Sequence, residues 1–369
     1  MKEGWEVKKI KDICDKATSN IAQNKLLGMS GDYPVFGASG YVQNVDFYHR
    51  DKPYIGVVKD GSGVGRVNIY PAFSSILGTL QYILPKKGYL IGYVAYALKG
   101  LNLAKFASGA AIPHIYFKDY GEEKISVPPL PEQSRIVEEL DLLSNIIEKK
   151  RQQLSELDNL AQSIFYDMFG DPVTNEKGWE VKKLGEFCQI SSSKRIYANE
   201  YCEEGIPFYR GKEITEKSKS NDISVELFIS AKKYEELKDK FGVPKIGDIL
   251  ITAVGTIGNI WVVDTDEPFY FKDGNVLWLQ MKSDINPVYF KFLLEILIDK
   301  HKTAMANGCA YSALTIVNLR EMGTNLIPLN LQQLFAKKIE AIEIEKKLIK
   351  QSIAETEELF NSRMDYYFN

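Results

Sequence analysis

The glycine-rich segment at residues 61–65 (GSGVG) is the first place where residue type and spacing could do chemistry. Glycines after a strand hold a nucleotide or S-adenosylmethionine when a helix follows, because the helix N-terminus then faces the phosphate or carboxylate. Here residues 66–71 (RVNIYP) follow, and they are typical of a strand. The turn at residues 255–258 (GTIG) is also followed by strand-like residues. The pattern therefore favours a hairpin turn over a cofactor loop at both places.

Other catalytic signatures are incomplete in this sequence. DNA amino-methyltransferases use an Asn/Asp-Pro-Pro-aromatic tetrapeptide, whereas the Pro-Pro pair here lies between Val127 and Leu130. No phosphate-binding loop of the form GxxxxGK[ST] occurs. The cysteines and histidines lack metal-ligand or nucleophile–base spacing. They are Cys14, Cys188, Cys202, Cys309, His49, His114 and His301. We therefore expect a chain without a catalytic or metal centre of its own.

Composition bounds the class of protein without indicating a function. The chain has 369 residues, of which 45% are hydrophobic and 26% are charged, as in a soluble globular protein of two or three domains. Its net charge of −3 does not favour a nucleic-acid partner, although residues 15–127 hold 12 Lys and Arg against 8 Asp and Glu. No apolar run reaches the ~20 residues of a membrane span, and residues 1–6 lack a signal-peptide core. We expect a cytoplasmic protein.

The elements that would position any site occur twice in this chain. Residues 4–10 (GWEVKKI) recur as residues 178–184 (GWEVKKL), at an offset of 174, and a cysteine follows each copy. Residues 129–133 (PLPEQ) correspond to residues 328–332 (PLNLQ), at an offset of 199. The difference, 199 − 174 = 25 residues, indicates an insertion in the second copy. We expect a polar loop between Gly211 and Gly247, because extra loop length costs little free energy.

Each copy consists of a mixed α/β body followed by a long helix. The predicted strands lie at residues 54–58 and 66–70 in the first body, and at 248–252 and 260–263 in the second. A helix is predicted near the end of each body, at residues 90–98 and 288–297. The fold class is therefore α+β with an internal pseudo-two-fold repeat. We place the first body at 1–128, the first long helix at 129–170, the second body at 171–327 and the second long helix at 328–369.

The two long helices each carry an apolar stripe whose spacing alternates between four and three residues. That period is typical of coiled coils. The first stripe contains Ile136, Leu140, Leu143, Ile147, Leu154, Leu157 and Ile164, with Lys150 as its polar member. The second contains Phe335, Ile339, Ile342, Ile349, Ile353 and Phe360, with Lys346 and Thr356 as polar members. Each stripe alone is compatible with an ordinary core-facing helix. Because the stripes occupy equivalent places in a repeat, we favour an antiparallel coiled coil between them.

Several segments together resemble one known family. They are the two GWEVKK openings, residues 33–40 (YPVFGASG), residues 107–113 (ASGAAIP) and residues 125–133 (ISVPPLPEQ) ahead of a long helix. This combination resembles the DNA-specificity subunit of type I restriction-modification systems. The resemblance covers essentially the whole chain, twice over. The second copy departs from the usual proline-rich lead, with residues 327–333 reading IPLNLQQ.

The resemblance implies a function without chemistry in this chain. In that family, two target-recognition domains each read one half of a bipartite site in double-stranded DNA, and the helix pair sets the spacer. Two modification (methyltransferase) subunits dock on the specificity subunit and methylate adenine with S-adenosylmethionine. Restriction subunits add ATP-dependent translocation and cleavage. The resemblance thus implies that S-adenosylmethionine and ATP bind the partner subunits and that this chain holds no cofactor.

Loop position and residue type indicate which side chains would contact DNA, by phosphate positioning or by base-edge contacts. The candidates in the first body are Tyr41, Lys59, Arg66, Ser108 and His114. Those in the second are Arg210, Lys212, Thr256, Lys272, Asn307 and Tyr311. An ordinary solvated surface is the alternative for each of them. For the whole chain, the alternatives are an orphan or decoy specificity protein, an interaction scaffold without a DNA role and, least favoured, a cofactor enzyme.

Overall fold

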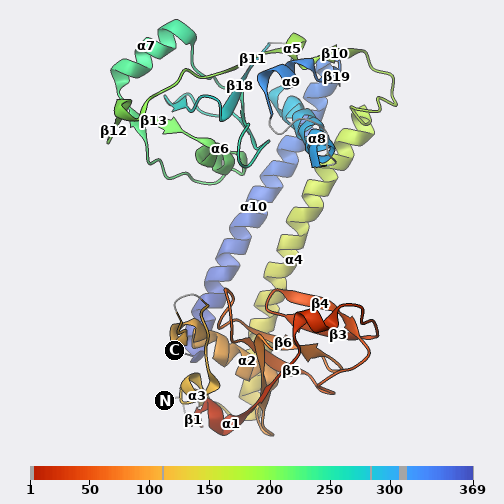
Figure 1. Ribbon diagram of the computed structural model, residues 1–369, viewed down its shortest axis with the longest axis vertical. Coiled ribbons are helices and arrows are strands. Elements are labelled where there is room, and N and C mark those ends of the chain that lie inside the picture. The colour runs from red at the N-terminus through yellow and green to blue at the C-terminus, as the bar shows by residue number, and fades with distance from the viewer. Residues whose placement is uncertain (1–3, 110–111, 283–284, 307–313, 369) are drawn as a thin grey trace. The chain divides into compact units, whose positions relative to one another are not determined.

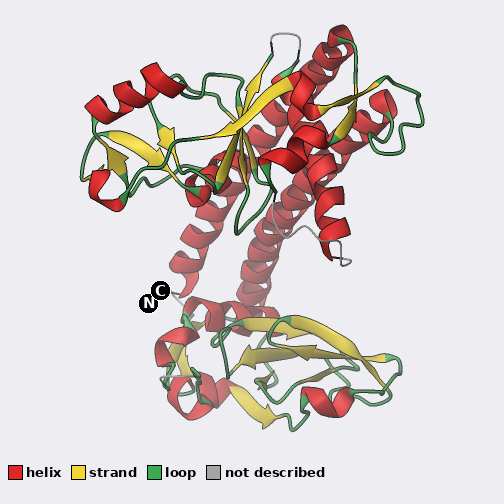
Figure 2. Ribbon diagram, turned by 45° about the horizontal axis from the view of Figure 1, so that its top comes forward, coloured by secondary structure: helices red, strands yellow, loops and turns green. Residues whose placement is uncertain are grey.

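The computed structural model describes residues 4–109, 112–282, 285–306 and 314–368. The chain divides into two compact units. Unit 1 comprises Met1–Gln152 with Ile349–Asn369, and unit 2 comprises Gln153–Leu348. Figure 1 labels the elements, and Figure 2 distinguishes the helices and strands of each unit. Within the described ranges, no helix combines the length and apolar character needed to cross a bilayer.

Unit 1 is built around an antiparallel four-stranded sheet in the order β2-β8-β5-β6. A smaller sheet has the order β4-β3-β7, in which β3 and β7 are parallel, and β1 pairs with β9. The strands are β1 (Glu6–Lys9), β2 (Cys14–Thr18), β3 (Tyr33–Gly37), β4 (Gly40–Val45), β5 (Tyr54–Val58), β6 (Val67–Tyr70), β7 (Ser75–Ile76), β8 (Leu80–Pro85) and β9 (Lys124–Val127). The short helices are α1 (Ile10–Ile13), η1 (Gln23–Leu26), α2 (Ile91–Gly100), η2 (Leu103–Phe106) and α3 (Phe117–Tyr120).

Unit 2 repeats this topology with the sheet order β11-β18-β15-β16, and the smaller sheet β12-β14-β13-β17 again contains a parallel pair, β13 and β17. Its strands are β10 (Val181–Lys183), β11 (Cys188–Ser192), β12 (Tyr201–Cys202), β13 (Ile206–Tyr209), β14 (Phe228–Ile229), β15 (Ile249–Thr252), β16 (Ile260–Val262), β17 (Tyr270–Phe271), β18 (Val276–Met281) and β19 (Gly323–Asn325). Its helices are α5 (Leu184–Phe187), η3 (Ala198–Glu200), α6 (Gly211–Ser218), α7 (Ala231–Phe241), α8 (Pro287–Ala306) and α9 (Ile316–Glu321). The two copies of the sequence therefore fold with the same strand order.

The insertion in the second copy is folded, so the expectation of a polar loop there was wrong. Helices α6 and α7 lie between Gly211 and Gly247. Ser230 caps α7 by accepting a hydrogen bond from the N–H of Lys233 at 3.2 Å. Tyr234 and Leu237 of α7 are buried. A capped helix with one buried face is stable against the domain, despite its many Lys and Glu residues.

The glycine turn at residues 61–65 joins two antiparallel strands, β5 and β6, so the predicted hairpin is confirmed and the cofactor loop is wrong. Gly65 has a φ of +86°, and a Cβ there would lie 2.5 Å from the N of Ala104. Glycine is therefore required by both the backbone and its close neighbour. The hairpin of β15 and β16 is antiparallel as well. The predicted helix at 288–297 is longer than expected, because α8 continues to Ala306.

The long helices α4 (Leu130–Phe169) and α10 (Leu329–Phe368) each contribute one segment to each unit. In unit 1, Arg135 of α4 donates to Tyr367 and Lys150 of α4 donates to Ser352, so the two segments run antiparallel there. In unit 2, Phe165 and Phe169 of α4 contact the ring of Phe335 of α10 at centroid distances of 5.6 and 5.4 Å. Every residue of the two predicted stripes is buried or half-buried.

The polar residues of the two stripes form hydrogen bonds and ion pairs between α4 and α10. The ammonium group of Lys150 donates to Thr356 Oγ1 at 3.3 Å as well as to Ser352. Lys346 pairs with Asp158 of α4 at 2.8 Å. A polar side chain within an apolar seam disfavours other registers, because its partner would then be missing.

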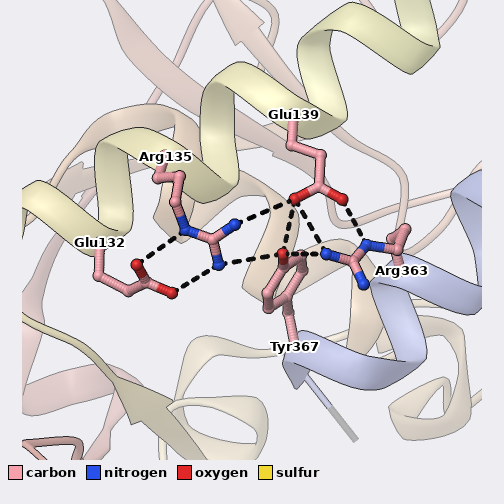
Figure 3. A network of polar contacts seen from close by, with 5 residues as sticks. All are labelled: Glu132, Arg135, Glu139, Arg363 and Tyr367. Carbon is pink, nitrogen blue, oxygen red and sulfur yellow. Dashed lines mark hydrogen bonds and ion pairs between the residues drawn. The ribbon is translucent and has the colours of Figure 1, made fainter.

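A larger polar network joins the start of α4 to the end of α10 within unit 1 (Figure 3). The carboxylate of Glu139 accepts hydrogen bonds from Arg363 and from the hydroxyl of Tyr367, the latter at 2.6 Å. Arg135 donates to Glu132 at 2.7 Å and to the Tyr367 hydroxyl at 3.3 Å. The hydrogen bond from Arg363 lowers the pKa of Glu139. Unit 2 has a cluster of aromatic rings, including Tyr289, where its own segments of α4 and α10 meet.

Candidate nucleic-acid interface

The candidate surface of unit 1 begins where the parallel strands β3 and β7 end. The N–H of Leu77 donates to the carbonyl of Phe36 at 2.8 Å, which ties the two strand ends together. Beyond them lies a groove of about 710 Å³, lined by residues from segments 20–23, 37–42 and 77–79. Tyr41 lies on its wall with 62% of its surface exposed, so this predicted residue borders a real concavity.

The hairpin of β5 and β6 brings three more predicted residues to this end of unit 1. The N–H of Lys59 donates to the carbonyl of Thr79, which also lines the groove, at 2.9 Å. Ser108 and His114 exchange backbone hydrogen bonds of 3.0 and 2.9 Å, and His114 forms a bridge to Asp60. The side chain of Lys59 is half-buried and pairs with Asp60 at 2.7 Å. The fold thus brings Lys59, Ser108 and His114 together next to the groove.

Arg66 does not join this cluster. Its exposed side chain donates to the carbonyl of Gly63 at 3.3 Å and borders a separate groove of about 370 Å³ with Lys99 and Asn102. Lys59 and Arg66 lie on opposite sides of the hairpin turn, as the predicted strands at 54–58 and 66–70 indicate. Arg66 is therefore a candidate for a phosphate contact apart from the main groove.

Unit 2 has its candidate residues at the equivalent strand ends. The N–H of Lys272 donates to the carbonyl of Tyr209 at 2.9 Å, the same bond that Leu77 makes to Phe36 in unit 1. Arg210 follows β13 directly and precedes α6, while Lys272 follows β17. Thr256, in the hairpin of β15 and β16, lies 3.3 Å from Thr215 of α6, between the two hydroxyl oxygens. Four predicted residues (Arg210, Lys212, Thr256 and Lys272) thus lie on or beside α6 and these strand ends.

Two carboxylates pair with Arg210 and Lys212 at the start of α6. Arg210 donates to Glu213 at 2.9 Å and to Glu226 at 2.8 Å, while Lys212 pairs with Glu226 at 2.7 Å. Burial alone would raise the pKa of Glu213, but the hydrogen bonds from Arg210 outweigh it and the pKa is lowered. The hydrogen bonds from Lys212 and Arg210 lower the pKa of Glu226 to about 2. A DNA phosphate would have to replace Glu226 on these cations.

Two predicted residues lie outside the described part of the chain, and three residues at the candidate surfaces were not predicted. Asn307 and Tyr311 fall outside the described residues. Glu226 was missed because its partners are 14 and 16 residues away in the sequence. The groove residues Asn20 and Gln23 were missed as well. The run of amides and hydroxyls that starts at the last residue of β2, residues 18–24 (TSNIAQN), is the signal that could have indicated them.

The repeated cysteines do not form a reactive site. Cys14 and Cys188 are 2% and 1% exposed. Burial raises the pKa of both thiols to about 12, so they are protonated at neutral pH and are poor nucleophiles. They are small side chains of the two cores. Within the described ranges, no three His, Cys, Asp or Glu residues gather as a metal site would require.

Comparison with known proteins points to one family. A family model described as the type I restriction modification DNA specificity domain matches residues 2–159 and 176–358. A Haemophilus influenzae protein, provisionally named as a type I restriction enzyme specificity subunit, is 25% identical over 99% of this chain and 95% of its own length. The specificity subunit of the type I restriction enzyme MjaVIII from Methanocaldococcus jannaschii is 28% identical over 55% of this chain and 54% of its own.

Solved structures share the fold. A type I restriction-modification S subunit from M. genitalium matches with a TM-score of 0.60 at 18% identity, covering 99% of this chain and 96% of that one. A chain from a study of complex assembly in the type I R-M system matches with a TM-score of 0.58 at 16% identity, covering 100% and 98%. Both similarities span the entire fold and both units.

Proposed function

The chain belongs to the type I restriction modification DNA specificity family, and from this premise we propose how its two units divide the recognition of DNA. The specificity subunit of such a complex binds DNA and is not itself an enzyme. We infer that unit 1 and unit 2 each read one half of a bipartite site in double-stranded DNA. The functional bodies are residues 1–128 and 171–327, with the helices at 129–170 and 328–369 between and after them.

One observation carries this proposal: a candidate surface of the same construction occurs in each unit. In unit 1 it lies at the ends of β3 and β7, where Leu77 bonds to Phe36. In unit 2 it lies at the ends of β13 and β17, where Lys272 bonds to Tyr209. Residues on loops at equivalent strand ends can diverge without disturbing the sheets beneath them. Each unit is therefore suited to its own DNA half-site.

The helices α4 and α10 have two roles in this proposal. Their antiparallel pairing as a coiled coil sets the spacer between the half-sites, because the polar partners within the seam of α4 and α10 disfavour other registers. The complex contains two modification subunits, which dock on the specificity subunit and methylate adenine with S-adenosylmethionine. Restriction subunits complete it where cleavage occurs, and the complex acts in the cytoplasm.

Methylation-detecting sequencing tests the proposal directly. We would compare DNA from cells carrying this gene and its neighbouring methyltransferase with DNA from cells lacking this gene alone. The expected result is loss of one split motif, with methyladenine on opposite strands of two short half-sites around a fixed gap. An unchanged methylome contradicts the proposal. Binding assays would then separate an orphan DNA-binding protein from a scaffold without a DNA role.

Individual phosphate contacts are tested with Arg66→Ala and Lys272→Ala. Each variant should lower DNA affinity for all sequences alike and reduce the salt slope of binding, log K against log[salt], by about 1, because one released counterion is lost with each contact. Binding to the split-motif duplex and to a scrambled duplex would be titrated across a salt series. A variant with unchanged affinity and slope removes that residue from the interface.

A further inference from the structure

We propose that the groove of unit 1 reads an adenine-containing base pair through the side-chain amides of Asn20 and Gln23. Both residues are exposed and line the groove at the ends of β3 and β7. Within the described ranges, neither amide has a hydrogen-bonding partner. The inference rests on the proposed DNA-recognition function and assigns to unit 1 the class of base that it selects.

The chemistry of the groove suits base edges better than phosphates. Its polar lining consists of amides and hydroxyls, those of Asn20, Gln23, Ser39, Tyr41 and Thr79, and no described lining residue is charged. An amide presents a donor and an acceptor side by side, which matches the N7 acceptor and N6 donor of adenine in the major groove. Phosphate recognition instead uses Arg and Lys. Lys59 is not part of the lining. It lies next to the groove, where its backbone N–H donates a hydrogen bond to the carbonyl of Thr79.

The loop that carries the two amides is held firmly against unit 1. Ile21 and Leu26 are 8% and 2% exposed and anchor the loop in the core. The N–H of Gly78 donates to the carbonyl of Ile21 at 2.8 Å. The amide of Gln43 donates to the carbonyl of Leu26 at 2.7 Å, so Gln43 positions the loop. A loop held in place before binding loses little entropy on contact with DNA.

The equivalent end of unit 2 shows that this chemistry is particular to unit 1. Lys272 occupies the position that Leu77 has in unit 1. Arg210, directly after β13, occupies the position of Gly37, the last residue of β3. Arginine and lysine favour phosphates and guanine edges rather than adenine. This amide contact to adenine is therefore expected in one half of the site only, and its loss should leave recognition of the other half unchanged.

Three variants of the full chain, assembled with its modification subunits, test the proposal in the methylome. The variant that removes the amide in contact with adenine, Asn20→Ala or Gln23→Ala, should relax one A·T position of one half-site by about tenfold or more in methylation preference, the size of one bidentate base contact. The spacer and the other half-site should be retained. Asn24→Ala is the matched control, because Asn24 is an exposed amide on the same turn η1 but does not line the groove. A motif that stays equally strict in all three variants overturns the inference.

A chemical substitution in the DNA tests the same contact without altering the fold. In a synthetic duplex of the motif, each adenine of each half-site would be replaced in turn by 7-deazaadenine, which pairs normally but lacks the N7 acceptor. At one position the wild-type complex should lose about tenfold in affinity, whereas the variant lacking the matching amide should lose nothing further. Equal wild-type affinity for all substituted duplexes overturns the inference while the DNA-recognition function stands. A wild-type chain that directs no split motif overturns the proposed function itself.

Discussion

At the scale of single residues, Glu226 holds the two cations at the start of α6 that we propose as DNA contacts. Its carboxylate bridges Arg210 and Lys212 at 2.8 and 2.7 Å, and 52% of its side chain is exposed. The second carboxylate, Glu213, is 2% exposed and keeps Arg210 in one orientation. Glu226 is therefore the partner that solvent and ligand reach. In the proposed interface, Glu226 would compete with a DNA phosphate for these two cations, since carboxylate and phosphate both accept charge-assisted hydrogen bonds.

Replacing Glu226 should strengthen DNA binding. In Glu226→Gln, Arg210 and Lys212 lose a competing charge, and we expect a several-fold gain in affinity near 0.1 M salt that shrinks as salt rises. Fluorescence anisotropy with the split-motif duplex across a salt series measures this. Glu203→Gln is the matched control, because Glu203 is exposed and has the same charge. Equal or weaker binding by Glu226→Gln contradicts this role.

The same ion pairs predict a pH dependence of stability. Hydrogen bonds from Lys212 and Arg210 lower the folded-state pKa of Glu226 to about 2, below the ordinary value of 4.5. A lowered carboxyl pKa stabilises the fold fully above pH 4.5, and this contribution is lost as the pH falls toward 2. The difference in Tm between the wild type and Glu226→Gln should therefore narrow from pH 5 to pH 3. A difference in Tm that stays constant from pH 5 to pH 3 would contradict a coupling between the ionisation of Glu226 and folding.

At the scale of elements, the network around Glu139 secures the end of α10 to the start of α4 (Figure 3). Arg363 and Tyr367 come from α10, and Arg135 comes from α4. Arg363 carries a charge, so its hydrogen bonds to Glu139 are stronger than neutral ones, and Arg135 adds an ion pair at 3.5 Å. Glu139 is 27% exposed in its side chain, which moderates their contribution. The network thus fixes the last turns of α10 in unit 1.

Removing one charge from this network should destabilise unit 1. We expect Glu139→Gln to lower the free energy of unfolding by about 1 kcal/mol at neutral pH, since charge-assisted hydrogen bonds are weakened. Glu138→Gln is the matched control, because Glu138 is the neighbouring, exposed carboxylate outside the network. Urea titrations measure both variants. Because the pKa of Glu139 is lowered, the difference should disappear as the pH falls below 4.5. Equal unfolding of the two variants argues against the network.

If α4 and α10 set the spacer, the length of these helices should determine the gap between the two DNA half-sites. One heptad inserted after Lys150 in α4, with a second before Ser352 in α10, keeps the seam in phase and lengthens each helix by about 10 Å. The preferred gap between the half-sites should then change by about three base pairs, with both half-sites retained. Methylome sequencing reads out both features. A variant with the native gap would refute the spacer role, and a heptad exchanged without a change in length is the control.

At the scale of the whole molecule, unit 1 is completed by the last segment of the chain. Residues Ile349–Asn369 belong to it although unit 2 lies between them and Gln152 in the sequence. Met364 and Tyr367 of this segment pack with Tyr93, Ile136 and Leu140 in one buried cluster. Unit 1 therefore cannot form its complete core until the segment that carries Met364 and Tyr367 has been synthesised.

A truncation tests this dependence. Deletion of residues 349–369 should expose the cluster around Tyr93 and destabilise unit 1, while the core of unit 2 around Phe290 and Leu293 is unaffected. Hydrogen exchange followed by mass spectrometry compares the two units in one sample, so unit 2 serves as the internal control. Equal protection of α2 in the full chain and in the truncated chain contradicts the prediction.

Much of this architecture follows from the sequence because it depends on local patterns. The repeat of residues 4–10 at 178–184 corresponds to two units with the same strand order. The stripes of α4 and α10 indicate their buried faces, because a heptad period places those residues on one side of a helix. The hairpin at residues 61–65 follows from strand-like residues on both sides of a glycine turn. Each of these features needs only neighbours within a few residues or a comparison of the chain with itself.

The candidate surface was decided by the tertiary structure. The groove depends on β3 and β7 lying parallel, although about 40 residues separate Val35 from its partner Ser75. Parallel pairing across such a distance leaves no periodic signal in the sequence. The fold brings Asn20 and Gln23 to the groove, moves Arg66 away from it and places Glu226 across Arg210 and Lys212. The sequence by itself therefore determined the repeat, the two central hairpins and the helix faces, whereas contacts between distant segments decided which side chains meet, because such contacts form only when the sheets assemble.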